Sequence, residues 1–172
     1  WETLDTAAVP GGRETLRLKR RGSEFSIMLG ANELMNTRLS GSEEALARLT
    51  IERLDVPAPR VLIGGLGLGF TLRAALPLLA PSARITVAEL VPAVVDWARG
   101  PLAAVHGDSL DDPRVDITVA DVGLAIRSAP WDTILLDVDN GPEGLSRAGN
   151  DALYSAAGLA ATHAALRPGG VV

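Results

Sequence analysis

Short apolar runs alternate with stretches of helical periodicity over most of this chain. The apolar runs are rich in Val, Ile and Leu and lie at residues 60–63, 84–88, 115–119 and 133–137. The stretches of helical periodicity lie at residues 40–54, 71–79, 92–99, 123–128 and 152–166. Short buried strands that alternate with helices are typical of a parallel sheet with helices on both faces. The pattern predicts an α/β fold with a Rossmann-like, doubly wound and mainly parallel sheet.

Near the start of the chain the period changes to two residues. Leu16 and Leu18 alternate with charged residues in the segment 14–20, and an alternating return strand at 25–29 follows the turn signal Arg21-Gly22. This pattern predicts a small antiparallel β appendage. We interpret it as a structural lid or as the surface of a possible homodimer.

We divide the chain into a β-hairpin appendage at 1–39 and a Rossmann-like nucleoside-binding domain at 40–172. The sequence begins at Trp1 without a methionine and ends at Val172, where another strand is starting. We therefore expect the second domain to be truncated at its C-terminus. The Pro168-Gly169-Gly170 segment is expected to end the last helix.

The first helix of the second domain carries a possible capping box. Ser40 and Glu43 have the spacing at which an N-cap hydroxyl and a carboxylate satisfy the free N–H groups of a helix. The helical spacing of Leu46 and Leu49 predicts that both face the core.

A glycine-rich turn, here called the glycine loop (residues 65–69), follows the first apolar run. Gly65, Gly67 and Gly69 allow the backbone to pass close to a ligand, and the next helix points its free N–H groups at the same place. In the dinucleotide fingerprint G-x-G-x-x-G the third glycine would fall at position 70, which is Phe70. A nicotinamide-dependent oxidoreductase is therefore disfavoured.

Acidic residues follow the other three apolar runs. They are Glu89, Asp121 and Asp137, and the carboxyl ends of parallel strands form the edge where ligands bind. Any one of them could be a helix cap, but three at one edge indicate a site. Glu89, twenty positions after Gly69, suits the two hydroxyls of a ribose, and Asp121 suits an adenine amine. The pattern predicts an adenosine-containing ligand.

Composition narrows the possible classes of function. The net charge of −5 gives no basic surface for nucleic acid, and the chain has no cysteine and two histidines, so we expect no metal site. His106 lies in a polar stretch and is expected at the surface. We find no apolar run long enough for a membrane span and no signal peptide, so a cytoplasmic protein is expected.

The glycine spacing resembles motif I of the class I S-adenosylmethionine-dependent transferases. A wider likeness is to the spermidine synthase family, and it covers most of the chain. It is carried by Asp111-Asp112-Pro113-Arg114-Val115, Ala120-Asp121, Trp131-Asp132-Thr133-Ile134-Leu135-Leu136-Asp137 and Leu166-Arg167-Pro168-Gly169-Gly170.

The resemblance implies a seven-stranded transferase fold with S-adenosylmethionine or its decarboxylated form as the donor. Asp137 would face the reacting end of the donor. The donor-binding residues are then expected to be Gly65, Leu66, Gly67, Gly69, Glu89, Leu90, Asp121, Val122 and Asp137.

Several acids expected from the resemblance are missing. The family's glycine turn carries an aspartate for the donor's amino group, and Leu68 stands there. The acid that contacts the attacking amine falls on Asn140, with Asp139 beside it as a possible substitute. Of the family's Tyr-His-Glu segment only Glu43 remains. A polyamine site needs carboxylates to bind a multiply protonated cation and to release a proton from the attacking amine.

Methyl transfer requires fewer catalytic groups than aminopropyl transfer to a polyamine, because the sulfonium is already activated. We therefore favour methyl transfer to an unidentified small-molecule acceptor, with Asp137, Asp139 and Asn140 orienting that acceptor or acting as base. The alternatives are aminopropyl transfer from decarboxylated S-adenosylmethionine and a non-catalytic nucleoside-binding domain.

Overall fold

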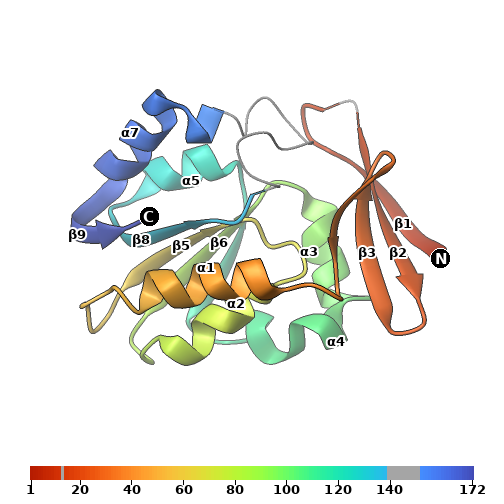
Figure 1. Ribbon diagram of the computed structural model, residues 1–172, viewed down its shortest axis with the longest axis horizontal. Coiled ribbons are helices and arrows are strands. Elements are labelled where there is room, and N and C mark those ends of the chain that lie inside the picture. Colours follow the sequence, from red (N-terminus) through yellow and green to blue (C-terminus); the bar gives the residue numbers. More distant parts are fainter. Residues whose placement is uncertain (13, 139–151) are drawn as a thin grey trace.

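The computed structural model describes residues 1–12, 14–138 and 152–172 of the chain (Figure 1). Two β-sheets dominate it, one covered by helices and one formed by the N-terminal residues alone.

The larger sheet has five parallel strands in the order β7-β6-β5-β8-β9. The strands are β5 (Arg60–Gly64), β6 (Arg84–Glu89), β7 (Val115–Val119), β8 (Trp131–Leu136) and β9 (Leu166–Val171). The chain starts in the middle of the sheet, moves outward to β7 and then crosses to β8 on the other side of β5. This doubly wound order confirms the predicted Rossmann-like fold.

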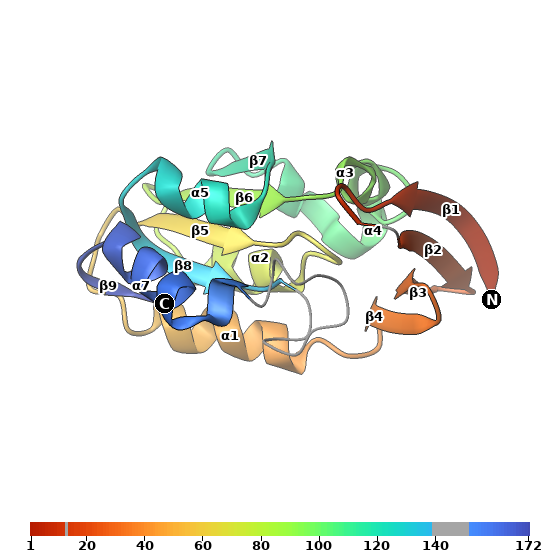
Figure 2. The ribbon, with the colours of Figure 1, turned by 90° about the horizontal axis from the view of Figure 1, so that it is seen from above.

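Helices cover both faces of this sheet (Figures 1 and 2). On one face lie α1 (Gly41–Ile51), α2 (Phe70–Ala75), α3 (Pro92–Arg99) and the short α4 (Ala103–His106). On the other face lie α5 (Val122–Ser128) and α7 (Ala156–Ala165). Two single 3₁₀ turns follow α2 and α4, at Leu76–Leu78 and Gly107–Leu110.

The side chains of the central strand divide between the two layers. Val61 and Ile63 of β5 pack into the core beneath α1, α2 and α3, whereas Leu62 packs into the smaller core beneath α5. All three are fully buried. A strand whose two faces are both covered reads as a continuous apolar run, which is why the sequence identified it.

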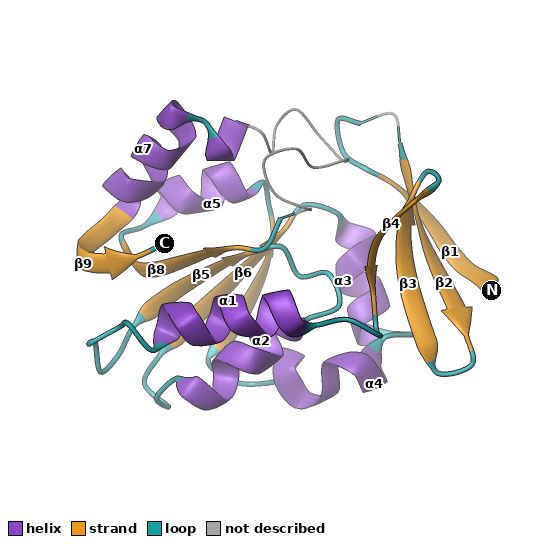
Figure 3. Cartoon of the chain, viewed as in Figure 1, coloured by secondary structure: helices purple, strands orange, loops and turns teal. Residues whose placement is uncertain are grey.

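The N-terminal sheet has four antiparallel strands in the order β1-β2-β3-β4 (Figure 3). They are β1 (Glu2–Ala8), β2 (Thr15–Arg21), β3 (Glu24–Leu29) and β4 (Asn32–Asn36). The predicted hairpin corresponds to β2 and β3. The alternation did not reveal β1, whose side chains are mostly exposed and polar.

One face of this sheet belongs to the main core. Leu18, Ile27 and Leu29 are buried and join the same apolar cluster as the helices α1 to α3. The indole N–H of Trp97, in α3, donates a hydrogen bond to Asp5 Oδ2 in β1 at 2.7 Å. This bond lowers the pKa of Asp5. The appendage is thus packed firmly against the Rossmann-like part.

Helix α1 begins where it was predicted, but without the capping box. The Ser40 hydroxyl donates to Glu44 Oε1 at 2.7 Å instead of accepting from a helix N–H group. Leu49 is 44% exposed, and Ala47 and Ile51 face the core instead. The apolar spacing was compatible with two helix faces, and packing against the sheet selected one of them.

The C-terminal prediction was also wrong in one respect. Pro168-Gly169-Gly170 does not follow the last helix as a terminator but lies within β9. The register of β9 on β8 shifts between the pairs Trp131–Leu166 and Thr133–Val171. A proline and a glycine with positive φ are tolerated in a strand at such an irregularity.

The glycine loop rests on a buried histidine. His106 is 1% exposed, so its predicted surface position is wrong, and neither ring nitrogen has a hydrogen-bond partner in the part of the chain that the structure describes. Burial, and then the charge of Arg73, lower its pKa to about 4. The Gly67 carbonyl acts weakly in the opposite direction, without the geometry of a hydrogen bond. The ring therefore packs as a neutral group.

We expect Gly69→Ala to destabilise the fold by about 2–5 kcal/mol. The residue has φ +76°, and a Cβ there would collide with the His106 ring. The left-handed backbone alone costs about 1–2 kcal/mol, and overpacking adds about 1–3 kcal/mol. Gly22→Ala is the matched control, because Gly22 has φ +60° and nothing within 4 Å of its added Cβ. Urea denaturation of both variants gives the comparison, and equal losses would show that the histidine contact carries no energy.

Candidate active site

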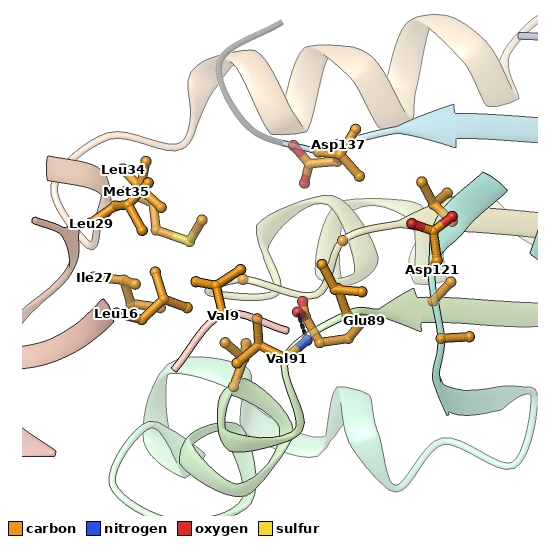
Figure 4. A pocket seen from close by; sticks show the side chains of 18 residues that line it. Val9, Leu16, Ile27, Leu29, Leu34, Met35, Glu89, Val91, Asp121 and Asp137 are labelled. Carbon is orange, nitrogen blue, oxygen red and sulfur yellow. Dashed lines mark hydrogen bonds between the residues drawn. The ribbon is translucent and has the colours of Figure 1, made fainter. Parts of the chain in front are cut away.

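The carboxyl ends of β5, β6, β7 and β8 meet at one edge of the larger sheet, beside the N-terminal sheet. A cavity lies there, and Figure 4 shows the side chains that line it. Glu89, Asp121 and Asp137 border it on the side of the Rossmann-like sheet. The structure therefore brings together the three strand-end acids that the sequence singled out.

The glycine loop turns tightly between two neighbouring strands. Gly65 has φ +93°, and a Cβ there would collide with the backbone carbonyl of Asp137. Its N–H donates to the Ala88 carbonyl at 2.9 Å, while the N–H of Asp137 donates to the Gly64 carbonyl at 2.9 Å. The loop thus ties the ends of β5, β6 and β8 together with backbone atoms alone.

Glu89, at the end of β6, holds the glycine loop through its side chain. Its Oε2 accepts a hydrogen bond from the Leu66 N–H at 3.0 Å, and its Oε1 accepts one from the Val91 N–H at 2.8 Å. Burial raises the pKa of this carboxyl, and the backbone N–H groups around it counteract the rise. A carboxylate has about four lone-pair positions, so these two bonds leave acceptor capacity for a ligand hydroxyl in the cavity.

Asp121 lies after β7 and caps the next helix. Its Oδ1 accepts a hydrogen bond from the Gly123 N–H at 2.8 Å, which is the expected N-cap contact. The residue is exposed and still lines the cavity. Capping and ligand contact are therefore compatible at this position.

Asp137 follows β8 and faces the cavity from the opposite side to Glu89 (Figure 4). Its Oδ2 accepts a hydrogen bond from the Thr71 hydroxyl at 2.7 Å. Burial raises its pKa to about 6; the Thr71 bond lowers it, and the negative charge of Glu43 raises it further. This carboxyl can therefore exchange a proton close to neutral pH, which is a property of general bases.

The N-terminal sheet forms the remaining wall of the cavity. Leu16, Ile27 and Leu29 lie on that wall together with Leu34 and Met35 of β4 (Figure 4). None of these side chains carries a charge. The appendage, interpreted from the sequence as a lid or dimer surface, is thus part of the cavity itself.

Met35 lies directly over the glycine loop. A Cβ on Gly67, which has φ +49°, would come within 2.7 Å of the Met35 sulfur. No local sequence signal indicated this contact, because it joins β4 to a loop about thirty residues further on. Gly67 is therefore required by its backbone conformation and by its neighbour.

A second cavity, here called the α1 cavity, adjoins the first. Ser42, Glu43 and Leu46 of α1 line it together with residues 66–70 of the glycine loop and α2. Leu34, Met35, Gly67 and Asp137 line both cavities. Asp137 thus lies where the two spaces meet.

The predicted donor-binding residues are divided between these cavities. Those bordering the first cavity are Gly65, Gly67, Glu89, Leu90, Asp121, Val122 and Asp137, and those bordering the α1 cavity are Leu66, Gly67, Gly69 and Asp137. Asp139 and Asn140 lie outside the described residues, so their predicted roles stay predictions. Residues 1–12, 14–138 and 152–172 contain no group of three or more acidic or histidine side chains that could hold a metal ion. They also contain no helix of the length and apolarity that crossing a membrane requires.

Comparison with known sequences identifies relatives for much of the chain. No family model matches it. Polyamine aminopropyltransferase 2 of Pseudomonas aeruginosa is 34% identical over 124 residues, which cover 69% of this chain and 33% of that protein. The polyamine aminopropyltransferase of Mycobacterium tuberculosis is 37% identical over 95 residues, or 52% of this chain and 17% of that protein. The chain spans a third or less of the length of these curated relatives.

Solved structures share the fold over almost the whole chain. A spermidine synthase in complex with the transition state analogue AdoDATO matches with a TM-score of 0.77 at 20% identity, over 96% of this chain and 55% of that one. The spermidine synthase of Thermotoga maritima matches with a TM-score of 0.72 at 19% identity, over 96% of this chain and 53% of that one. A probable spermidine synthase of Corynebacterium glutamicum matches with a TM-score of 0.65 at 17% identity, over 98% of this chain and 61% of that one. In sequence and in fold, the chain is thus spermidine synthase-like, with the fold of the class I S-adenosylmethionine-dependent transferases.

Proposed function

We propose that this chain binds an adenosyl sulfonium donor, decarboxylated S-adenosylmethionine or S-adenosylmethionine, and belongs to an enzyme that transfers an aminopropyl group to a small-molecule amine. The observation that carries the proposal is the arrangement of the glycine loop, Glu89, Asp121 and Asp137 around one cavity. Glu89 would accept the ribose hydroxyls and Asp121 the adenine amine. The glycine loop would admit the arm of the donor that leads to its sulfonium.

Asp137 has the position and the proton affinity for the reacting end. In aminopropyl transfer the lone pair of a neutral amine forms a bond to the carbon next to the sulfonium. The carbon–sulfur bond breaks, and its electron pair stays on sulfur, which leaves a neutral thioether nucleoside. The nitrogen loses a proton, which Asp137 can accept while its carboxylate also stabilises the cationic reactants.

The comparisons favour aminopropyl transfer over the methyl transfer that we inferred from the sequence. The relatives are named for aminopropyl transfer and the structural neighbours are spermidine synthases. One observation still favours methyl transfer, namely that Leu68 stands where the resemblance predicts an aspartate. Leu68 is 2% exposed and cannot pair with the amino group of a decarboxylated donor. Methyl transfer therefore stays the second candidate, supported by this one residue.

Calorimetric titration of one protein sample with four ligands tests the proposal. We expect decarboxylated S-adenosylmethionine and methylthioadenosine to bind, and NAD to bind at least tenfold more weakly, because Phe70 stands where the dinucleotide fingerprint has glycine. Tighter binding of S-adenosylmethionine than of its decarboxylated form would favour methyl transfer instead. Binding of none of the four would contradict the donor assignment.

We expect Glu89→Gln to weaken methylthioadenosine binding about 10- to 100-fold. The amide keeps one oxygen acceptor but replaces the other oxygen by a donor, which can accept neither a ribose hydroxyl nor the second backbone N–H group. Titration calorimetry measures the loss, and circular dichroism checks the fold. Glu33→Gln, in β4 and outside the lining of both cavities, is the control. Unchanged affinity in a folded Glu89→Gln protein would refute the ribose assignment.

Binding of a cationic donor should depend on pH through Asp137. Its pKa of about 6 lies above the ordinary value of 3.8, so Asp137 contributes fold stability that is present below pH 3.8 and lost as the pH rises through 6. A bound sulfonium favours the ionised form. We therefore expect its affinity to rise about tenfold between pH 5 and pH 7.

Two comparisons test whether the rise of donor affinity with pH comes from Asp137. Methylthioadenosine is neutral at sulfur and should show a much smaller rise over the same pH range. Asp137→Asn keeps an oxygen that can accept from Thr71 and removes the titrating group, so it should abolish the rise for the cationic donor. A full pH dependence in Asp137→Asn would assign the titration to another group.

A further inference from the structure

A buried threonine, Thr71, contacts the carboxyl group at the junction of the two cavities. It belongs to the first turn of α2, two residues after the glycine loop, and it is 1% exposed. Threonine hydroxyls in helices commonly bond to a carbonyl one turn back in the same helix. The Thr71 hydroxyl instead donates to Asp137 Oδ2 at 2.7 Å, and Asp137 lies 66 residues further along the chain. The contact is therefore a tertiary one, between the start of α2 and the end of β8.

The backbone of Asp137 is held without this hydroxyl. Its N–H donates to the Gly64 carbonyl at 2.9 Å, and Leu136 is paired with Gly64 in the parallel register of β8 on β5. These contacts fix the path of the chain at the end of β8, but they leave the side-chain torsions of the aspartate free to rotate. The Thr71 bond restrains those torsions, so it orients the carboxyl group rather than the strand.

The hydroxyl also stabilises the ionised carboxyl. In the described part of the chain, the charged side chains that line the two cavities are all acids, namely Glu43, Glu89, Asp121 and Asp137. Burial and the charge of Glu43 raise the pKa of Asp137, whereas the Thr71 bond lowers it. A hydroxyl that donates to a carboxylate favours its charged form. Thr71 therefore acts against the two influences that favour the neutral acid.

We propose that Thr71 is a positioning residue: its hydroxyl orients the Asp137 carboxylate at the junction of the two cavities and favours the ionised form, which can accept a proton from an attacking amine. The inference rests on the proposed function and adds a residue to it. In this step an N–H bond of the amine breaks and its proton goes to a carboxylate oxygen. The nitrogen forms the new bond to carbon as the carbon–sulfur bond breaks. Thr71 lines neither cavity, so it acts through Asp137.

Carbon-13 NMR of the side-chain carboxyl groups tests the inference in the ligand-free chain, with Asp137→Asn to identify the signal of Asp137. Thr71→Val has nearly the same shape without the hydroxyl, and we expect it to raise the pKa of Asp137 by about one pH unit. Thr71→Ser keeps the hydroxyl and should restore the wild-type titration. An unchanged titration in a folded Thr71→Val protein would overturn the proposal.

A second buried threonine separates this effect from a general loss of packing. Thr133, in β8, is 0% exposed and lines neither cavity, and its hydroxyl donates to the Val171 carbonyl at 2.8 Å. Thr133→Val should lower the free energy of unfolding without moving the titration of Asp137. An equal shift in Thr133→Val would assign the effect to packing and refute the role of Thr71.

Thr71→Ala covers the case in which Thr71→Val does not fold. It removes the same hydroxyl without placing a second methyl group beside the carboxyl. We expect it to raise the pKa of Asp137 as well, and no rise in a folded Thr71→Ala protein would also contradict the proposal.

The affinity for a cationic donor gives an independent readout. With a pKa of about 6 in the wild type and about 7 in Thr71→Val, the ionised fraction of Asp137 at pH 6 falls about fivefold. Calorimetric titration with decarboxylated S-adenosylmethionine should therefore show about fivefold weaker binding at pH 6 and nearly equal binding at pH 8. Methylthioadenosine, which is neutral at sulfur, should bind both proteins alike at both pH values.

The two kinds of measurement separate the positioning role from the proposed function. If the titration of Asp137 shifts in Thr71→Val but none of the adenosyl ligands binds the wild-type chain, the donor assignment fails and the action of Thr71 on Asp137 stands. If the donor binds with a pH dependence that Asp137→Asn abolishes and Thr71→Val leaves unchanged, the positioning role fails and the proposed function stands.

Discussion

The two hydrogen bonds accepted by Glu89 are the constraint on which the site depends. They join the glycine loop, through Leu66, to the turn between β6 and α3, through Val91. The carboxylate is 8% exposed, and its burial would be unfavourable without these partners. One buried acid thus positions the loop and, in the proposed function, remains available to the ligand.

The neighbours of the glycine loop leave no space for a side chain at its three glycines. The Asp137 carbonyl, the Met35 sulfur and the His106 ring each occupy the space in which a side chain of the loop would project. The three contacts come from the residue that follows β8, from β4 and from the end of α4. The glycine loop therefore packs against the N-terminal sheet, against His106 and against the backbone of Asp137.

The chemistry of the site depends on which charged side chains lie near Asp137. Burial raises the pKa of Asp137 to about 6, the hydrogen bond from the Thr71 hydroxyl lowers it, and the charge of Glu43 raises it. Leu68 and Met35 surround the same junction without charge. An acid whose pKa lies close to neutral suits a reaction in which an amine must lose a proton.

The sequence alone determined the Rossmann-like sheet, the glycine loop and the acids at the strand ends, because strand periodicity and turn chemistry are local properties. Tertiary structure decided which distant segments of the chain pack against these elements. It buried His106 in a polar stretch, turned Leu49 outward, drew Pro168-Gly169-Gly170 into β9 and placed Met35 over Gly67. These outcomes depend on contacts between segments far apart in the chain, and no periodicity within a single segment can encode them.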